Sequence, residues 1–225
     1  MRQIIIISIT LLLVNSCAFN GLYYYPDKAE LETFQDANSF TLMNDDLEIK
    51  GLFYERSAPK ASIFFLHGNA GNLNGWSNVA QSFFDEGYQV YLIDYPGFGA
   101  SSGNPSHKNV ISSAQLAFED FISKPSVKDT KVILMGFSLG GNLALKIGIN
   151  NQEQIDGMVL EGAFTDQKSI AAERTPFPMK FSAKMIVKNF VKGKELIQEW
   201  MKPLLIIHSE DDVVCPYYMG KELYE

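Results

Sequence analysis

Short apolar runs separated by polar and glycine-rich stretches dominate the chain from residue 60 onward. Residues 63–66, 90–93, 131–135, 156–161 and 204–207 are mostly Val, Ile, Leu, Phe and Met. Continuous runs of this length are typical of parallel strands that are buried on both faces. Polar residues follow several of these runs directly. The pattern therefore predicts a mostly parallel sheet with polar side chains gathered at its carboxyl edge.

Two further patterns complete the expected architecture. Residues 39–55 alternate between apolar and polar around Asn44-Asp45-Asp46, which predicts an antiparallel hairpin at the sheet edge. Residues 76–85, 106–123 and 139–149 carry helical periodicity and lie between the predicted strands. Helices that alternate with strands indicate a single α/β domain, which we place at residues 38–225.

About forty residues before the strand at 204–207 are not required by the core. They begin with Thr175-Pro176-Phe177-Pro178. We expect a cap insertion here, at about residues 165–200. Apolar residues recur at helical spacing opposite a row of lysines: Met179, Ala183, Ile186 and Phe190, and Lys180, Lys184, Lys188 and Lys192. The favoured interpretation is a cap helix with solvated lysines, and the alternative is a basic face against anionic lipid headgroups.

The start of the chain has the pattern of a secretory signal. Residues 1–3 carry one positive charge, residues 4–14 are almost wholly apolar, and Asn15-Ser16-Cys17 follows. This end resembles a bacterial lipoprotein processing site, so we expect residues 1–16 to be removed and Cys17 to be lipidated. Residues 17–37 would then be a tether to the membrane of the cell envelope. A plain signal peptide or a short anchor helix is the alternative.

Composition and charge restrict the partners. The net charge is −7, and removal of residues 1–16 takes away one arginine, which leaves 18 − 26 = −8. An acidic chain without a basic patch of any size argues against nucleic acid as a partner. Lipidation of Cys17 would leave Cys215 as the sole cysteine, so we expect no intramolecular disulfide.

The motif Gly136-Phe137-Ser138-Leu139-Gly140 follows the strand at 131–135 directly. A serine between glycines at a strand-to-helix turn is typical of a nucleophile elbow. The turn is tight, and small neighbours two residues to either side avoid a clash with the following helix. The pattern predicts that the Ser138 hydroxyl is presented to a substrate.

Three more motifs occur in order with the elbow: His67-Gly68-Asn69-Ala70-Gly71, residues 94–103 (Asp-Tyr-Pro-Gly-Phe-Gly-Ala-Ser-Ser-Gly), and His208-Ser209-Glu210-Asp211-Asp212. With them the chain resembles the α/β-hydrolase superfamily, in its branch with a His-Gly-Asn-x-Gly-Asn turn. The resemblance implies eight mostly parallel strands, flanking helices, a small helical cap, and a Ser, Asp, His triad in that chain order.

Within this resemblance Ser138 matches the nucleophile and Asp212 matches the acid. Asp212 is preferred over Asp211 because Pro216 lies four residues after it, as in the Asp-x-x-Val-Pro motif of the family. Glu161 is the fallback acid, because it ends the preceding strand.

Residues around the expected site are assigned structural or oxyanion-binding roles. Asp94 is expected to be structural, and Cys215 to be a small apolar residue without a lowered thiol pKa. The family implies two oxyanion donors, the backbone N–H groups of Leu139 and of Asn69.

No histidine matches the catalytic base. His67 and His208 occupy structural positions at strand ends, and His107 is expected to be a solvated residue before a helix. In the family the catalytic histidine follows one further strand, and residues 221–225 resemble the helix before it. We therefore expect that the last strand and helix of the fold are missing from this chain.

The expected function is a membrane-tethered serine hydrolase that cleaves an acyl ester, amide or thioester. A perhydrolase or a serine peptidase would use the same residues. The alternative from another class is a non-catalytic binding protein that keeps the pocket. No metal, nucleotide or flavin signature is present in the sequence, so no cofactor is expected, and the expected partners are a small acyl substrate and the membrane.

Overall fold

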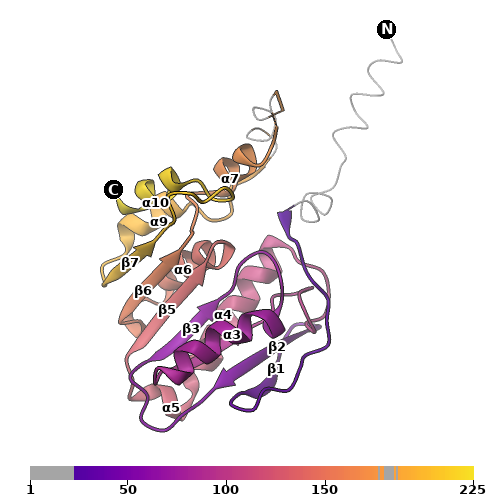
Figure 1. Ribbon diagram of the computed structural model, residues 1–225, viewed down its shortest axis with the longest axis vertical. Coiled ribbons are helices and arrows are strands. Elements are labelled where there is room, and N and C mark those ends of the chain that lie inside the picture. The colour runs from indigo at the N-terminus through magenta and orange to yellow at the C-terminus, as the bar shows by residue number, and fades with distance from the viewer. Residues whose placement is uncertain (1–22, 177, 180–184, 186) are drawn as a thin grey trace.

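One sheet organises the part of the chain that the computed structural model describes, residues 23–176, 178–179, 185 and 187–225. Its order is β1-β2-β4-β3-β5-β6-β7 (Figure 1). The strands are β1 (Asn38–Asn44), β2 (Leu47–Tyr54), β3 (Ser62–Leu66), β4 (Gln89–Ile93), β5 (Val132–Phe137), β6 (Gly157–Glu161) and β7 (Leu204–Ile207). Strands β3 to β7 are parallel, and β1 and β2 form the predicted antiparallel hairpin at one edge. This is the expected α/β-hydrolase sheet, with seven strands in the described residues.

Helices connect the parallel strands. They are α3 (Leu73–Asp85), α4 (His107–Ser123), α5 (Pro125–Lys128), α6 (Leu139–Asn150), α7 (Gln167–Glu173), α9 (Gly193–Leu196) and α10 (Tyr217–Tyr224). Helix α3 begins three residues before the expected 76. The Asn72 side chain accepts from the Asn74 N–H, and the Asp94 carboxylate accepts from the Leu73 N–H, so the first turn is capped from both sides.

The two faces of the sheet carry separate cores because side chains alternate along each strand. On β3, Ile63 and Phe65 pack on the face that α3 covers. Phe64 and Leu66 pack on the opposite face, against residues of α4 and α6. All four side chains are buried, which explains why β3 is a continuous apolar run.

The order of the strands places a switch point between β3 and β5. The chain passes from β3 to β4 on one side and then to β5 on the other side of β3. Ligands of open parallel sheets bind outside the carboxyl ends of the strands at such a point. The turns after β3 and β5 begin at His67 and Ser138, so the predicted site residues lie at this position.

Residues 23–37, which we expected to be part of a tether, lie along the domain instead. Tyr24 is only 3% exposed and joins the core on the α4 face. Further along, the Lys28 ammonium donates to the Ser101 carbonyl, and the Gly99 N–H donates to the Asp27 carbonyl. Aromatic burial and these hydrogen bonds dock the segment. The expected signal at residues 1–16 and Cys17 lie outside the described residues, and no helix within the described chain has the length and apolar character of a membrane span.

The cap region differs from the expected helix at its carboxyl end, whereas Met185 within the expected span is helical. Residues 187–192 are not helical, and Lys192 forms an isolated antiparallel bridge with Asp166. The buried Gln167 side chain accepts from the N–H groups of Phe190 and Val191 through its Oε1. Its Nε2 donates to Oδ1 of the Asn142 side chain. These bonds hold the backbone in a non-helical path. Residues 180–184 and 186 of the expected helix lie outside the described residues.

Candidate active site

The Ser138 backbone makes a strained turn between β5 and α6. Its φ is 52° and its ψ is −110°, a conformation that residues with a Cβ rarely adopt. Such a conformation costs on the order of 1–3 kcal/mol. The Ser138 N–H donates to the Glu161 carbonyl at 2.8 Å, and the Ser138 carbonyl accepts from Gly141 and Asn142. The surrounding backbone therefore holds the strained residue in place.

The two flanking glycines allow this turn. A Cβ on Gly140 would collide with the backbone carbonyl of Leu66, at the end of β3, and a Cβ on Gly136 would collide with the carbonyl of Gly140. The amino end of α6 thus lies directly against the backbone of the sheet. This is the steric reason that the sequence pattern predicted.

The acid loop follows β7 and returns to the same edge of the sheet. Asp212 Oδ1 accepts from the N–H groups of Val214 and Cys215, both at 2.8 Å, which fixes the carboxylate. Asp212 Oδ2 lies 3.5 Å from the position of a Cβ on Gly162, directly after β6. Asp211 is exposed. The fallback acid Glu161 ends β6 and contributes its carbonyl to the elbow.

Cys215 lies against Ser138, the predicted nucleophile. Its Sγ lies 3.7 Å from Ser138 Oγ, within the distance of a weak hydrogen bond to sulfur, and the residue is 2% exposed. Burial raises the pKa of the Cys215 thiol to about 11, so the sulfur is a neutral thiol at neutral pH. It acts here as a small apolar neighbour, as the sequence suggested.

The predicted oxyanion turn comprises residues 67–71 after β3. Gly71 has a φ of 76°, and the Trp76 indole donates to the Ala70 carbonyl at 3.0 Å. The Tyr95 hydroxyl donates to the His67 carbonyl at 2.8 Å. Within the described residues the backbone N–H groups of Asn69 and Leu139 donate to no acceptor. Both remain available to a developing negative charge.

His67 is structural in its contacts. The ring is fully buried, stacks on Trp76 and lies beside Tyr95, and its Nδ1 is 2.7 Å from the Gly68 carbonyl. Burial lowers the pKa of His67 to about 4, so the imidazole is neutral at neutral pH.

Asp94, near His67, has the structural place that we expected. Its carboxylate lies 3.7 Å from His67 Nε2 and accepts from the first turn of α3. Burial raises the pKa of Asp94 to about 7.

His208 braces the acid loop. Its Nε2 is 2.6 Å from the Cys215 carbonyl, which can only accept, so Nε2 carries the proton. The same nitrogen lies 3.7 Å from Asp212 Oδ2, and the side chain is 3% exposed. An Nε2 that donates to a carbonyl has no lone pair for the Ser138 proton.

His107 is not the solvated residue that we expected. It begins α4, with Ser106 as the N-cap, and its Nδ1 is 2.8 Å from the Tyr24 hydroxyl. Phe190 stacks on the ring at a centroid distance of 3.8 Å. Burial lowers the pKa of His107 to about 4. The reason is the docked N-terminal segment, which covers the start of α4.

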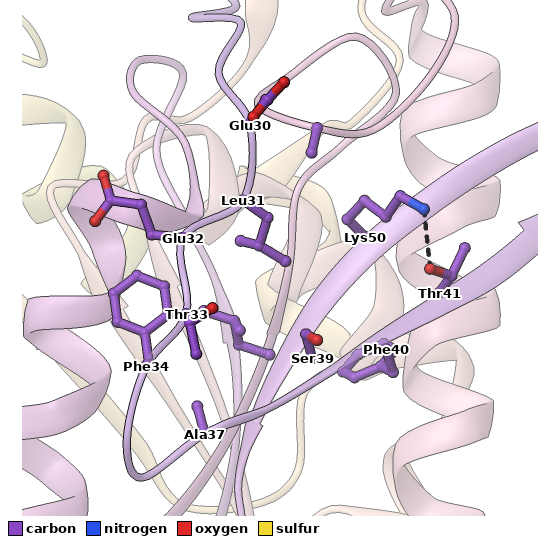
Figure 2. Close-up of a pocket in the computed structure, with 12 residues that line it drawn as sticks. Glu30, Leu31, Glu32, Thr33, Phe34, Ala37, Ser39, Phe40, Thr41 and Lys50 are labelled. Atoms are coloured by element: carbon purple, nitrogen blue, oxygen red, sulfur yellow. Dashed lines mark hydrogen bonds between the residues drawn. The ribbon is translucent and has the colours of Figure 1, made fainter.

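Two cavities of the described chain are not lined by Ser138. One, of about 400 Å³, separates residues 30–37 from the hairpin at the edge of the sheet (Figure 2). Figure 2 shows Lys50 donating to Thr41 on its wall, so its one lysine already has a partner. The other, of about 380 Å³, lies beside β7 and α10. His208, which contacts the loop of Asp212, lines the second cavity.

Sequence reasoning missed one group near the site, the aromatic residues that begin the described chain. Tyr23 packs against the cluster that contains Cys215, and the Asn69 side chain donates to the Tyr23 carbonyl. The run Tyr23-Tyr24-Tyr25-Pro26 was the available signal, because three adjacent tyrosines are uncommon in a free tether. Sequence alone did not indicate where they would dock.

The pattern of the serine aminopeptidase S33 family (Hydrolase_4) matches residues 57–197, more than half of the chain. The chain belongs to this family. The uncharacterized protein YfhR of Escherichia coli K12 is 28% identical over 97% of this chain and 78% of its own length. The mouse lysophosphatidylserine lipase ABHD12 is 32% identical over 73% of this chain, which spans 44% of ABHD12.

Two solved structures show the same fold. The Pyrococcus furiosus esterase Pf2001 superposes with a TM-score of 0.70, at 16% identity over 89% of this chain and 81% of its own. An α/β hydrolase from Vibrio vulnificus also reaches 0.70, at 20% identity over 84% and 69%. At these identities the likeness supports the α/β-hydrolase fold alone.

Gly140→Ala tests the steric constraint at the elbow. The new Cβ meets the Leu66 backbone, which cannot move aside, so we expect the free energy of unfolding to fall by about 3 kcal/mol or more. The matched control is Gly75→Ala in α3, where a Cβ meets nothing within 4 Å. That change should stabilise the protein by about 0.5–1 kcal/mol. Urea unfolding of both variants measures the difference, and equal effects would contradict the constraint.

The burial of His107 predicts a pH dependence of stability. Below the ordinary histidine pKa of about 6.5 the unfolded state takes up a proton, whereas native His107 stays neutral down to about pH 4. Stability should therefore fall through this window. Between about pH 6.5 and pH 4 we expect the free energy of unfolding of the wild type to fall by about 1–2 kcal/mol more than that of His107→Gln. Partial exposure of the ring makes this difference smaller than the full pKa shift would give. Urea midpoints at several pH values measure it, and parallel curves would contradict the prediction.

Proposed function

We propose that this protein is a serine hydrolase that cleaves an acyl ester, amide or thioester, with Ser138 as the nucleophile. The observation that carries the proposal is the strained backbone of Ser138, directly after β5 at the switch point of the sheet. Strain of this kind persists where the surrounding structure enforces it, and it is concentrated at functional sites. A loop with only a structural role would have no use for the strained backbone.

The chemistry follows from the groups around the serine. Ser138 Oγ attacks the acyl carbonyl carbon, the carbonyl π electrons move to its oxygen, and a base takes the hydroxyl proton. The Leu139 and Asn69 N–H groups, which lack acceptors within the described residues, would donate to the oxyanion. Collapse of the intermediate expels the alcohol, amine or thiol with a proton. Water then hydrolyses the acyl-enzyme.

Asp212 is the proposed acid of the triad. Two backbone N–H groups hold one of its oxygens, and the other faces the carboxyl end of β6. A carboxylate fixed in this way orients an imidazole through a hydrogen bond and stabilises the imidazolium that forms.

The proposed base is an imidazole that His67, His107 and His208 do not supply. His67 is fully buried, and His107 is hydrogen-bonded to Tyr24. His208 donates to the Cys215 carbonyl. Among the described side chains, Ser138 Oγ has the Cys215 thiol as its partner. Without the base, a triad retains only the contribution of the oxyanion hole and of substrate binding, so these 225 residues by themselves should turn over slowly.

We favour an ester as the substrate because two similar proteins are named as ester-cleaving enzymes. ABHD12 of the mouse is a lysophosphatidylserine lipase, and Pf2001 is an esterase. The second candidate function is a non-catalytic binding protein, and it is supported by the missing contact between Ser138 and any of the three histidines.

We further propose that the protein is secreted and anchored to a membrane of the cell envelope through a lipid on Cys17. The sequence of residues 1–17 supports this localisation.

Fluorophosphonate labelling and imidazole rescue test the nucleophile and the base together. The probe should label Ser138 alone, and Ser138→Ala should prevent labelling. The Ser138-dependent hydrolysis of p-nitrophenyl acetate should rise by on the order of tenfold or more with added imidazole, because a free base partly replaces the absent one. Subtraction of the Ser138→Ala rate removes the direct reaction of imidazole with the ester.

Three results would go against parts of this proposal. Loss of the Ser138-dependent rate in a correctly folded His107→Gln or His208→Asn variant would identify a resident base. Absence of labelling, with equal rates for wild type and Ser138→Ala, would favour the binding protein. Labelling at another serine would remove Ser138 as the nucleophile.

Metabolic labelling tests the lipid anchor. A producing bacterium grown with a radiolabelled fatty acid should incorporate label into the wild-type protein. Cys17→Ala should carry no label, because the substitution removes the thiol to which the lipid would be attached. Cys215→Ala is the matched control and should be labelled like the wild type. Equal labelling of Cys17→Ala and the wild type would exclude lipidation at Cys17.

A further inference from the structure

We propose that Tyr23 is a wall of the acyl-binding pocket and limits the length of the acyl chain that reaches Ser138. This inference rests on the proposed function, because it assigns the substrate class of the same site. It names a specificity-determining residue that lies outside the motifs of the family, in the segment that leads into the domain. The preferred substrates are then short acyl groups.

The first observation is the position of the Tyr23 ring. It packs against a separate buried cluster made of Phe164, Ile170, Cys215 and Met219. Cys215 Sγ is in turn 3.7 Å from Ser138 Oγ. The cluster that contains Cys215 therefore lies between the tyrosine and the proposed nucleophile.

The second observation is the way in which the backbone of the segment is fixed. The Asn69 side-chain amide donates to the Tyr23 carbonyl, and the Asn69 Oδ1 accepts from the Tyr25 N–H at 3.3 Å. One asparagine side chain thus binds the backbone on both sides of Tyr24. Because the N–H of the same residue is a proposed oxyanion donor, the segment that carries Tyr23 is attached directly to the predicted oxyanion turn.

Tyr24 provides the anchor beside Tyr23. Its hydroxyl is hydrogen-bonded to His107, and its ring lies edge-on to Phe98 and to Tyr23. With 3% of its surface exposed, Tyr24 is part of the core. A ring fixed by its neighbour on one side and by Asn69 on the other forms a rigid wall.

The chemistry of the cluster fits an apolar group. Phe164, Ile170 and Met219 are hydrocarbon or thioether side chains, and each is buried. Burial raises the pKa of the Tyr23 hydroxyl well above its ordinary value, so the ring adds no charge. An acyl chain that enters beside Cys215 would meet apolar surface and then the tyrosine ring. Removal of the ring extends the apolar space in that direction.

The test compares acyl chain lengths. The wild type should prefer p-nitrophenyl acetate and butyrate over octanoate. Tyr23→Ala should raise the ratio of kcat/KM for octanoate to that for acetate by at least about tenfold, because each further buried methylene contributes about fourfold. Tyr25→Ala is the matched control: the side chain is 53% exposed, its N–H remains, and the ratio should stay that of the wild type.

A binding measurement separates this inference from the proposed function. In the Ser138→Ala background, calorimetry with octanoate as the probe should show at least about tenfold tighter binding when Tyr23→Ala is added. This arm requires no catalysis. If Ser138→Ala hydrolyses the esters as fast as the wild type, the proposed function fails and octanoate binding still decides the role of Tyr23.

Several outcomes would overturn the proposal. Unchanged ratios and unchanged octanoate affinity in a Tyr23→Ala variant with a wild-type thermal midpoint would do so, as would equal rises in Tyr23→Ala and Tyr25→Ala. If Tyr23→Ala does not fold, Tyr23→Leu retains apolar packing in a smaller volume and should give an intermediate rise in the ratio. A Tyr23→Leu ratio equal to the wild type would then overturn it.

Discussion

The direct approach of α6 to the backbone of the sheet is the constraint on which the site depends. Only glycine at 140 lets the amino end of the helix lie against the Leu66 carbonyl, and only glycine at 136 lets β5 pass beneath the first turn. The chain between them has no room for a relaxed turn, so Ser138 takes a positive φ. Because β3 ends at Leu66, the same contact brings the elbow next to the oxyanion turn.

Local patterns predicted the features that depend on neighbouring residues. The continuous apolar run of β3 follows from burial on both faces. The glycine at 136 follows from sterics within five residues, since a Cβ there meets Gly140, whereas the glycine at 140 faces Leu66 of β3 and was predicted from the motif. The hairpin could be predicted because its turn and its alternation are both local, and Asp45 there has a φ of 53°. The start of α3 could not, since Asp94 supplies a cap from a different strand.

Features that depend on distant partners escaped sequence reasoning. The periodicity of residues 179–192 is helical, and Met185 is helical, yet residues 187–192 are not, because Gln167 binds two of their N–H groups and Asp166 bridges Lys192. Tertiary hydrogen bonds therefore override a local preference. The docking of Tyr23 and Tyr24 is of the same kind, since it depends on Asn69, which lies 46 residues after Tyr23 in the chain.

The two halves of the site are consequently held in different ways. The elbow is fixed by backbone contacts of the sheet and α6, which change only if the core changes. The oxyanion turn is held by side chains: Trp76 and Tyr95 from the core, and Asn69 through the segment that begins at Tyr23. Small displacements of an oxyanion donor weaken catalysis strongly, because the donor must point at the charge that develops. Under the proposed function, the reactivity of Ser138 therefore depends on how the N-terminal segment is docked, although the serine itself is positioned without it.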